Sequence, residues 1–560
     1  MTDAKHLPAV LLLLATAWGG AACYHVGPIF DDADGKGADA DGDADGDSDG
    51  DADSDTDGDS DTGDDTGSDT DNDNDTDIDT DADTDGDTDG DSDIVPSGRL
   101  LWAVNAGGGG ADWGGAISGF VDGASMVTGA INGYAVFGRG EIAETHLGSS
   151  GPNFFVARYG RSGALDWASA PLRLGSVETT MVAALTDGAT ALGGDFTDVL
   201  VLGAGTFDTV TLTSAGHRGA FFARLDADGS PDWAAGLGDK AEAYPGAVAA
   251  MPDGAFVALA SFSGTAVVGQ GTRGETSFAA SGTNDLLIAR FAADGSLDWA
   301  RAVTGSGECW GTVAGIDDGF LAYGWCLGEN VFGPGEGNET VLDSGSEGAL
   351  FLARYGADGN LEWARLVSGS NAGFGYGLAA LPDGSAVWVT GVFHGTQTFG
   401  EGDPNETTVT APEDIGAASF VARYDGGGRF DWVTHPTSGS LDGRVSIVAR
   451  GDGTAFLAGT FHDSVAFDEG QPSEARVTTP SPGNPTVVVA RLETDGRAGW
   501  MTWAGSITGG SEGYGISVAK DKVVVTGLMQ GDADFGAGEP NHTLLDCFGD
   551  LDVFVAAYEP

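Results

Sequence analysis

The chain has 560 residues and a formal net charge of −62 at pH 7, and glycine is abundant at 95 residues. The segment from Asp31 to Asp93 contributes −29 of that charge, through 30 Asp and one Lys, so −33 lies in the rest of the chain. Acidic charge in both parts excludes nucleic acid and anionic membrane surfaces as partners. It agrees with a solvated acidic surface or with cation binding.

The N-terminus predicts a secretory signal. Lys5 and His6 precede a short apolar stretch, Leu7–Trp18, which is too short for a membrane-spanning helix. The following Gly20-Ala21-Ala22-Cys23 resembles a bacterial lipobox, although Gly20 stands where that pattern has Leu. The resemblance implies that residues 1–22 are a lipoprotein signal peptide and that Cys23 is the lipid attachment site. An ordinary cleaved signal with an incidental Cys23 is the alternative.

Residues 23–98 are predicted to be a disordered, Asp-rich linker. From Asp39 to Asp93 the chain nearly alternates Asp with Gly, Ala, Ser or Thr, so it cannot bury a core and its charges repel one another. Windows such as Asp41–Gly46 match the first half of a calcium loop, but Ala52 stands where the closing Glu belongs. We interpret the segment as a spacer, with a low-affinity calcium segment as the alternative.

Residues 99–560 contain a long-period repeat. Each unit has a strand-like phrase such as FLARY at Phe351, a turn such as GADGN, and then a Trp in a second strand-like phrase. Two further strand candidates follow, usually separated by Asp-Gly, which is a strong hairpin signal. The Trp residues stand at Trp102, Trp167, Trp233, Trp299, Trp363, Trp432 and Trp500.

Four short strands in each of seven units predict an all-β fold, a single seven-bladed β-propeller of four-stranded blades. The domain starts on the Trp102 strand without a preceding phrase and ends on Phe554–Tyr558 without a following Trp strand. We therefore expect the two ends to complete one blade by pairing. Within each hairpin the Arg of the phrase is expected to face the acid before Trp, as Arg158 faces Asp166.

The units resemble the bacterial seven-bladed β-propeller repeat (SBBP) family, on the phrases at 351–365, 376–393 and 399–407. The resemblance implies the fold and brings no catalytic motif. With a lipobox and an acidic linker, the chain also resembles cell-envelope lipoproteins of Gram-negative bacteria, which implies a lipid anchor in the outer membrane or at the cell surface.

Few residues carry chemistry in a recognisable pattern. No His pair has zinc spacing, there is no phosphate-binding loop, and the G-x-S-x-G string at 509–513 is not followed by a helix. Oxygen-rich turns such as Gly402–Asn405 are explained by turn chemistry, with calcium as the alternative. Trp113, Trp310, Trp325 and Trp388 lie off the regular positions. Stacking on a sugar ring is one reading of these Trp residues, and packing is the other.

The cysteines of the repeat region predict one disulfide. Cys309 and Cys326 lie on neighbouring strand candidates around Asp318-Gly319, so we expect a bond in an oxidising compartment, with two buried thiols as the alternative. Cys547 is then left over, as a free or an intermolecular thiol.

The sequence therefore favours a non-catalytic, surface-tethered binding or scaffold lipoprotein. We expect it to be a monomer, held to the membrane by its lipid, with an unknown protein or glycan ligand. No metal is assigned, and Ca²⁺ is the cofactor to test. The alternative is an extracellular glycan-active hydrolase or lyase with its site at the central channel, because propeller enzymes draw their residues from separate blades.

Overall fold

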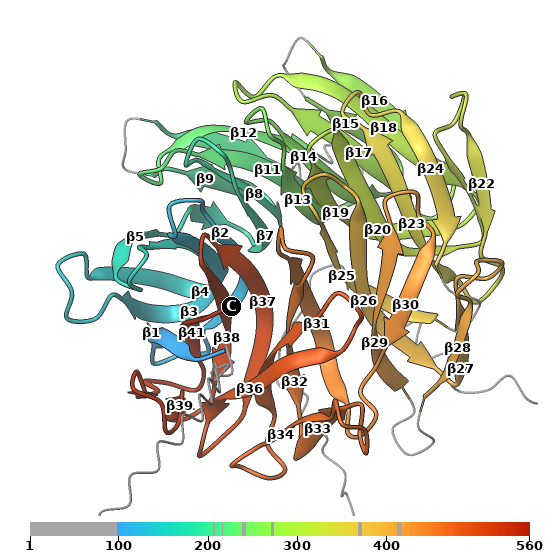
Figure 1. The fold of residues 1–560 in the computed structure, drawn as a ribbon. Helices are drawn as coiled ribbons and strands as arrows, with labels where there is room; N and C mark the ends of the chain where they lie inside the picture. Colours follow the sequence, from blue (N-terminus) through green and yellow to red (C-terminus); the bar gives the residue numbers. More distant parts are fainter. Residues whose placement is uncertain are drawn as a thin grey trace, which may run out of the picture. The chain divides into compact units, whose positions relative to one another are not determined.

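The structure is a computed structural model that describes residues 98–204, 208–214, 217–237, 242–269, 274–367, 372–411 and 417–560. The predicted signal, Cys23 and the acidic linker lie outside the described residues. Within them the regular elements are all β-strands, paired antiparallel, and no helix is long and apolar enough to cross a membrane (Figure 1).

Twenty-eight of the strands form seven four-stranded units, whose hydrogen-bonded order is the following. Unit 1 is β2 (Trp113–Gly119), β3 (Ser125–Phe137), β4 (Thr145–Tyr159) and β5 (Leu165–Ser169); unit 2 is β7 (Val177–Ala184), β8 (Thr190–Phe196), β11 (Gly219–Leu225) and β12 (Pro231–Leu237); unit 3 is β13 (Ala243–Ala250), β14 (Phe256–Phe262), β17 (Asp285–Phe291) and β18 (Leu297–Gly305); unit 4 is β19 (Glu308–Ile316), β20 (Gly319–Leu327), β23 (Ala349–Gly356) and β24 (Leu361–Leu366); unit 5 is β25 (Ala372–Ala380), β26 (Ala386–His394), β29 (Ala417–Asp425) and β30 (Phe430–Thr434); unit 6 is β31 (Leu441–Ala449), β32 (Ala455–Phe461), β35 (Thr486–Leu492) and β36 (Ala498–Ser506); unit 7 is β37 (Ser511–Ala519), β38 (Lys522–Met529), β41 (Asp552–Tyr558) and β1 (Leu100–Gly108).

The first strands of the units contact one another in a closed cycle. β2 contacts β7, and the contacts continue through β13, β19, β25 and β31 to β37, which contacts β2 again. Figure 1 shows these strands at the centre of the described units, with the other strands of each unit outside them. This arrangement is that of a β-propeller.

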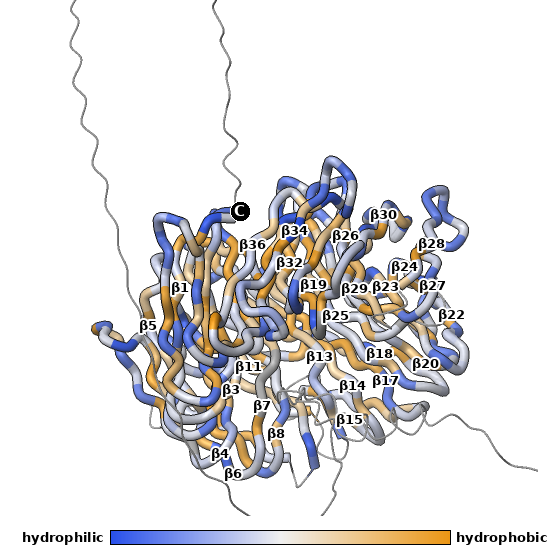
Figure 2. The backbone as a smooth tube through the Cα atoms, turned by 90° about the horizontal axis from the view of Figure 1, so that it is seen from below, coloured by the Kyte–Doolittle hydropathy of each residue, from blue (hydrophilic) through white to orange (hydrophobic). Residues whose placement is uncertain are grey.

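Several middle strands are buried along their whole length because each unit is covered on both faces by its neighbours. Every residue of β8, β11, β14, β38 and β41 is buried. In Figure 2 hydrophobic colour follows the strands, and hydrophilic colour gathers in the turns that join them.

A second hairpin accompanies most units at the outer edge, where the sequence pattern indicates only a loop. The pairs are β9 (Val199–Leu202) with β10 (Val210–Thr213), β15 (Thr265–Val268) with β16 (Thr276–Ala279), β21 (Glu329–Phe332) with β22 (Thr340–Asp343), β27 (Thr396–Phe399) with β28 (Thr407–Thr410), β33 (Ser464–Phe467) with β34 (Ala475–Thr478), and β39 (Ala533–Phe535) with β40 (Thr543–Leu545). Some bind the preceding unit, as β21 pairs with β18 and β39 with β36. The remaining strand, β6 (Leu172–Leu174), pairs with β9.

Each repeated Trp lies against a glycine of the next unit. A Cβ on Gly359, for example, would come within 2.8 Å of the Trp299 ring. The glycine always stands four residues before the next repeated Trp and has a positive φ. The seven contacts are Trp102–Gly163, Trp167–Gly229, Trp233–Gly295, Trp299–Gly359, Trp363–Gly428, Trp432–Gly496 and Trp500–Gly98. They too form a closed cycle.

Most of these indoles also make a hydrogen bond to the next unit. Trp299 Nε1 donates to the Ala357 carbonyl over 3.1 Å, and Trp102, Trp167, Trp233 and Trp432 do the same with the equivalent turns. Because the donor and the van der Waals contact both fix one indole on one turn, the angle between neighbouring units is strongly specified.

The expected Arg–acid ion pairs are present in five units, but the acid does not stand directly opposite the Arg in the strand pairing, as was expected. Arg158 pairs across the strands with Trp167, and Asp166 lies at a β-bulge beside that pair. From the bulge, Asp166 still reaches Arg158 at 3.3 Å. The same pairs form between Arg224 and Asp232, Arg290 and Asp298, Arg354 and Glu362, and Arg423 and Asp431. Arg491, which has no acid at that position, pairs with Glu493 at 3.3 Å.

The two ends of the described chain meet in unit 7. β41 lies between β38 and β1, with Ala557 opposite Trp102 and Phe554 opposite Asn105. An ion pair of 2.7 Å between Arg99 and Glu559 adds to this pairing. Glu539 accepts a hydrogen bond of 2.5 Å from the Leu100 amide. The pairing expected from the phase of the ends is therefore present.

We predict that Gly359→Ala destabilises the protein more than Gly335→Ala. Both glycines have nearly the same positive φ, +79° and +81°, so both variants carry the backbone cost of about 1–2 kcal/mol. Only the Gly359 Cβ meets an indole, whereas a Cβ on Gly335 meets nothing within 4 Å. Overpacking should add roughly 1–3 kcal/mol to the loss in unfolding free energy, measured by urea denaturation. Equal losses would contradict the role given to the Trp–Gly contact.

Deleting Val553–Pro560 should lower the melting temperature strongly or cause aggregation. It removes most of β41, exposes the edges of β38 and β1, and strips out Phe554 and Tyr558, which are both buried. Burying one such side chain contributes about 1.5–3 kcal/mol, whereas the whole free energy of unfolding of a protein is only about 5–15 kcal/mol. Deletion of 38–93, measured in the same calorimetric series, should leave the melting temperature almost unchanged. If the chain without Val553–Pro560 melts at the same temperature as the full chain, the two ends do not share one unit.

Candidate functional site

The first strands of all seven units line one central cavity, with a volume of about 540 Å³. It is the channel that the cyclic arrangement of the units encloses. Its wall is lined by residues 115–117, 181–182, 245–248, 310–313, 324–325, 374–378, 444, 446–447 and 514–516.

Irregular backbone shapes the channel wall. Six of the seven first strands have a register shift against their neighbour, at Gly114/Ala116, Thr179/Met181, Pro245/Ala247, Gly375/Leu378, Asp442/Ser446 and Gly513/Gly515. A β-bulge re-aims the side chains that follow it. β19 pairs with β20 without a shift, so its Trp310 lies directly opposite Trp325.

Four aromatic side chains of units 3, 4 and 5 form two ring pairs, whose indoles stand on paired residues of β19 and β20; we call them the aromatic belt. The ring centroids of Tyr244 and Trp310 lie 5.3 Å apart, and those of Trp325 and Phe374 lie 6.4 Å apart. Trp310, Trp325 and Phe374 line the channel, and all four residues are half-buried. At one end of this aromatic belt, the Arg218 guanidinium lies 5.5 Å from the centroid of Tyr244.

The four irregular Trp residues of the sequence thus have different places. Trp310 and Trp325 line the channel, whereas Trp388 is fully buried in a core cluster between units 5 and 6. Trp113 is half-buried at the first position of β2. Packing is therefore confirmed for Trp388, while the pair on β19 and β20 lies at the channel surface.

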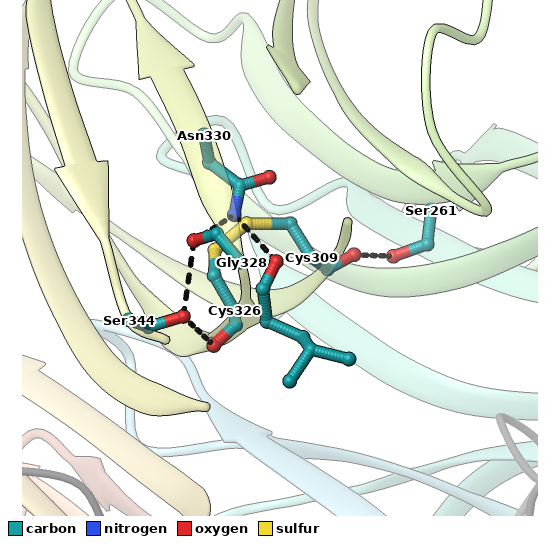
Figure 3. The surroundings of a disulfide bond; sticks show 7 residues. Ser261, Cys309, Cys326, Gly328, Asn330 and Ser344 are labelled. Atoms are coloured by element: carbon teal, nitrogen blue, oxygen red, sulfur yellow. Dashed lines mark hydrogen bonds between the residues drawn. A yellow bond between two sulfur atoms is a disulfide. The ribbon is translucent and has the colours of Figure 1, made fainter. Parts of the chain in front are cut away.

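A disulfide joins Cys309 and Cys326 next to that pair, with a Cα–Cα distance of 4.2 Å (Figure 3). It links β19 to β20 at the residues directly beside Trp310 and Trp325. Ser261 Oγ donates to the Cys309 carbonyl and Ser344 Oγ to the Cys326 carbonyl, each over 2.8 Å. The hairpin that carries the two indoles is therefore fixed both covalently and by hydrogen bonds.

Cys547 is a free, half-buried thiol. Burial raises its pKa, so the thiol form is favoured over the reactive thiolate.

Polar groups meet on the opposite side of the channel, in units 6 and 7. Tyr514 Oη donates to Glu512 Oε2 over 2.6 Å, and Ser446 Oγ donates to the Tyr514 carbonyl over 2.5 Å. Burial, together with the Glu512 charge, raises the pKa of Tyr514 well above its usual value, so the phenol stays protonated. Arg444 lines the channel on the same side.

Acids of the outer loops hold backbone groups. Glu336 accepts from the Leu361 amide over 2.6 Å, and Asp403 accepts from the Phe430 amide over 2.9 Å. Asn405, in the loop for which calcium was the alternative, donates to the Asp431 carbonyl over 3.3 Å. In the described part of the chain, no three His, Cys, Asp or Glu side chains gather as a metal site would require. Glu336, Asp403 and Asn405 therefore stabilise the turns by hydrogen bonds to the backbone.

Two buried carboxyl groups lie where unit 7 meets unit 1. Asp112 accepts from the Gly108 amide over 2.9 Å and from the Asn132 amide over 2.8 Å, while Asp552 accepts from the Phe548 amide over 2.9 Å. Both residues are 0% exposed. Burial raises the pKa of each to about 6, and the Asp112 charge adds to the effect on Asp552.

Comparison with known proteins gives a partial match. A model of the family described as "Domain of unknown function (DUF5122) beta-propeller" matches residues 274–298, around β16 and β17. Together with the cyclic strand arrangement, this match identifies the fold as a β-propeller. No curated protein is significantly similar to the chain.

Several solved structures are similar at low identity. The Dos1 propeller is 8% identical, with a TM-score of 0.36, covering 82% of this chain and 95% of its own. A protein of unknown function from Dyadobacter fermentans is 10% identical, with a TM-score of 0.34, covering 83% and 100%. Sqt1 from Chaetomium thermophilum is 12% identical, with a TM-score of 0.35, covering 83% and 99%.

We predict that Asp552→Asn flattens the pH dependence of stability between about pH 4 and pH 6. A carboxyl whose pKa is about 6 in the folded state and about 3.9 unfolded binds more protons when folded over that interval. The free energy of unfolding of the natural protein should therefore fall as pH rises through it. Chemical denaturation at several pH values, compared between the two proteins, measures the difference. Parallel curves would contradict the prediction.

Proposed function

We propose that this protein is a non-catalytic, surface-tethered binding protein whose ligand site is the central channel. It would belong to the seven-bladed repeat (SBBP) type, closed by its terminal strands. The observation that carries the proposal is the aromatic belt, which rests on a disulfide-fixed hairpin in a channel lined by every unit. Concave sites with aromatic walls and a few polar groups are the usual form of a ligand site.

A glycan is the ligand class that the channel favours. Indole and phenol rings offer flat apolar surfaces to the C–H face of a sugar, while Arg444 and Tyr514 offer polar groups at the opposite wall. A protein segment is the other ligand expected from the sequence. Rigid aromatic anchors serve either ligand, since little conformational entropy is lost when it binds.

The proposed location is the cell envelope, with the lipid on Cys23 as anchor and residues 23–98 as spacer. The disulfide between Cys309 and Cys326 supports a compartment outside the cytoplasm, because such bonds persist under oxidising conditions. The acidic spacer would keep the propeller away from an anionic surface by charge repulsion.

The second candidate is a glycan-active hydrolase or lyase. It is favoured by Glu512, a carboxyl group bonded to the channel residue Tyr514, and by Arg444, a charged group of the channel wall. Hydrolysis of a glycosidic bond commonly needs two carboxyl groups about 5–10 Å apart. Release of shortened glycans from a bound ligand would therefore favour this candidate over a binding protein.

Trp310→Ala should weaken glycan binding at least about tenfold, which corresponds to about 1.4 kcal/mol for one anchoring aromatic residue. A glycan array, run with and without calcium, identifies the ligand, and titration then compares variants. Tyr134→Ala is the matched control, because Tyr134 is an aromatic residue that is 53% exposed on β3 and lies outside the channel lining. A Trp310→Ala protein that is folded and binds as well as the natural one would refute the channel site.

Cys23→Ala should release the protein from the membrane fraction while leaving the propeller folded. The acyl chains on one cysteine would provide the anchor, at about 0.8 kcal/mol per buried CH₂. Cell fractionation with circular dichroism of the released protein measures both effects. Continued membrane association of the variant would show that Cys23 is not the anchor.

A further inference from the structure

The grooves between neighbouring units are filled by an arginine at two junctions. Arg365, two residues after Trp363, extends from unit 4 to unit 5. There its Nη1 lies 3.0 Å from Asp403 Oδ2 and donates to the Gly428 carbonyl over 2.5 Å. Both partners belong to the next unit, one in its outer loop and one in its turn.

Arg301 has the same place between units 3 and 4. Two residues after Trp299, its Nε lies 3.7 Å from Glu336 Oε1, and its Nη2 donates to the Asp358 carbonyl over 3.4 Å. The groove is therefore complementary to a guanidinium group, held between a carboxylate and a backbone carbonyl beside an indole.

The junction between units 5 and 6 has the groove without the arginine. Thr434 stands two residues after Trp432, where Arg301 and Arg365 stand in their units. A cavity of about 560 Å³ opens there, and we call it the junction pocket. Its lining includes Trp432, Thr434, Asp468, Gln471, Asp495 and Arg497.

A carboxylate has changed position in the loop that borders the junction pocket. Gln471 stands where Glu336 and Asp403 stand in the other two loops, four residues after a Phe. Asp468 directly follows Phe467, at a position where the outer loops of the six other units have a glycine. These glycines have φ between 61° and 68° and are Gly138, Gly203, Gly269, Gly333, Gly400 and Gly536. Asp468 itself has φ 55°.

Asp468 is kept in a conformation that disfavours most side chains, with its carboxylate at the pocket. A non-glycine residue there is strained, and such strain is concentrated at functional sites. Ser473 Oγ donates to Asp468 Oδ2 over 2.9 Å, while Arg491 and Arg497 form their ion pairs with Glu493 and Asp495. Arg497 is 65% exposed and lies 3.7 Å from Asp495, so it neutralises the other carboxylate.

We propose that the junction pocket binds a guanidinium group supplied from outside, the arginine side chain of a peptide or protein partner. The bound group would occupy the position that Arg365 fills between units 4 and 5, with Asp468 as its carboxylate partner and the turn of unit 6 as its carbonyl partner. The charge of −33 outside the acidic segment attracts a cationic partner. This site is separate from the channel, and it stands or falls independently of the proposed function.

The test uses the full chain and two blocked amino acids, N-acetyl-arginine amide and N-acetyl-citrulline amide, followed by ligand-observed NMR titration. The arginine derivative should bind and its neutral isostere should bind at least about tenfold more weakly. Affinity should fall as salt rises, since the interaction is ionic. Equal binding of the two compounds would overturn the proposal. Methylguanidinium is the third probe. If it binds as tightly as the arginine derivative, the guanidinium group alone accounts for the binding, and a small guanidino compound would overturn the peptide or protein as its source.

Variants locate the binding in the junction pocket. Thr434→Arg supplies the missing guanidinium from within the chain and should reduce binding at least about tenfold, whereas Thr434→Val, which leaves the groove open, should keep it. Asp468→Asn removes the proposed partner and should also reduce binding. The channel variant Trp310→Ala should bind the arginine derivative normally. Undiminished binding in both folded variants, Thr434→Arg and Asp468→Asn, would refute the junction pocket as the site.

Discussion

The contact between each repeated indole and a glycine of the next unit is the constraint on which the other features depend. A four-stranded antiparallel sheet has no reason of its own to stand at a fixed angle to its neighbour. The indole of Trp299 rests on Gly359 and donates to the carbonyl of Ala357, so one side chain sets both distance and rotation. Repeated seven times, with Trp500 on Gly98 as the last contact, the same relation brings the chain back to its start.

Closure in turn creates the channel. Once the first strands are held in a cycle, their inward side chains surround the channel. Register shifts in six of these strands then determine which residues line its wall. Aromatic residues gather on one side and hydroxyl and charged groups on the other. The disulfide beside Trp310 then fixes the part of the wall where the bulge is absent.

The regular part of this fold could be predicted from the sequence, because its causes are local. The Trp spacing, the Asp-Gly turns and the phase of the ends led to seven units and to the pairing of the Trp102 strand with the Phe554 strand. The outer hairpins were missed because their strands are only three or four residues long. The second strand of several hairpins also alternates half-buried with exposed positions, which is a weak pattern. Which irregular Trp faces the channel could not be predicted, because the sequence does not show that β19, unlike the other first strands, pairs with its neighbour without a register shift.

Departures from the repeat are where this protein can acquire function. Positions that all units share are used for closure, so a change there costs stability in the whole cycle. Units 3, 4 and 5 differ from the others in their belt of aromatic residues, and unit 4 alone among the described residues carries the disulfide. Asp468 is the clearest case, because a side chain stands where the other units need glycine. The strain is tolerated in one of the outer loops. The groove beside it lacks the arginine that fills the equivalent grooves after units 3 and 4, and it is complementary to a group of the same chemistry.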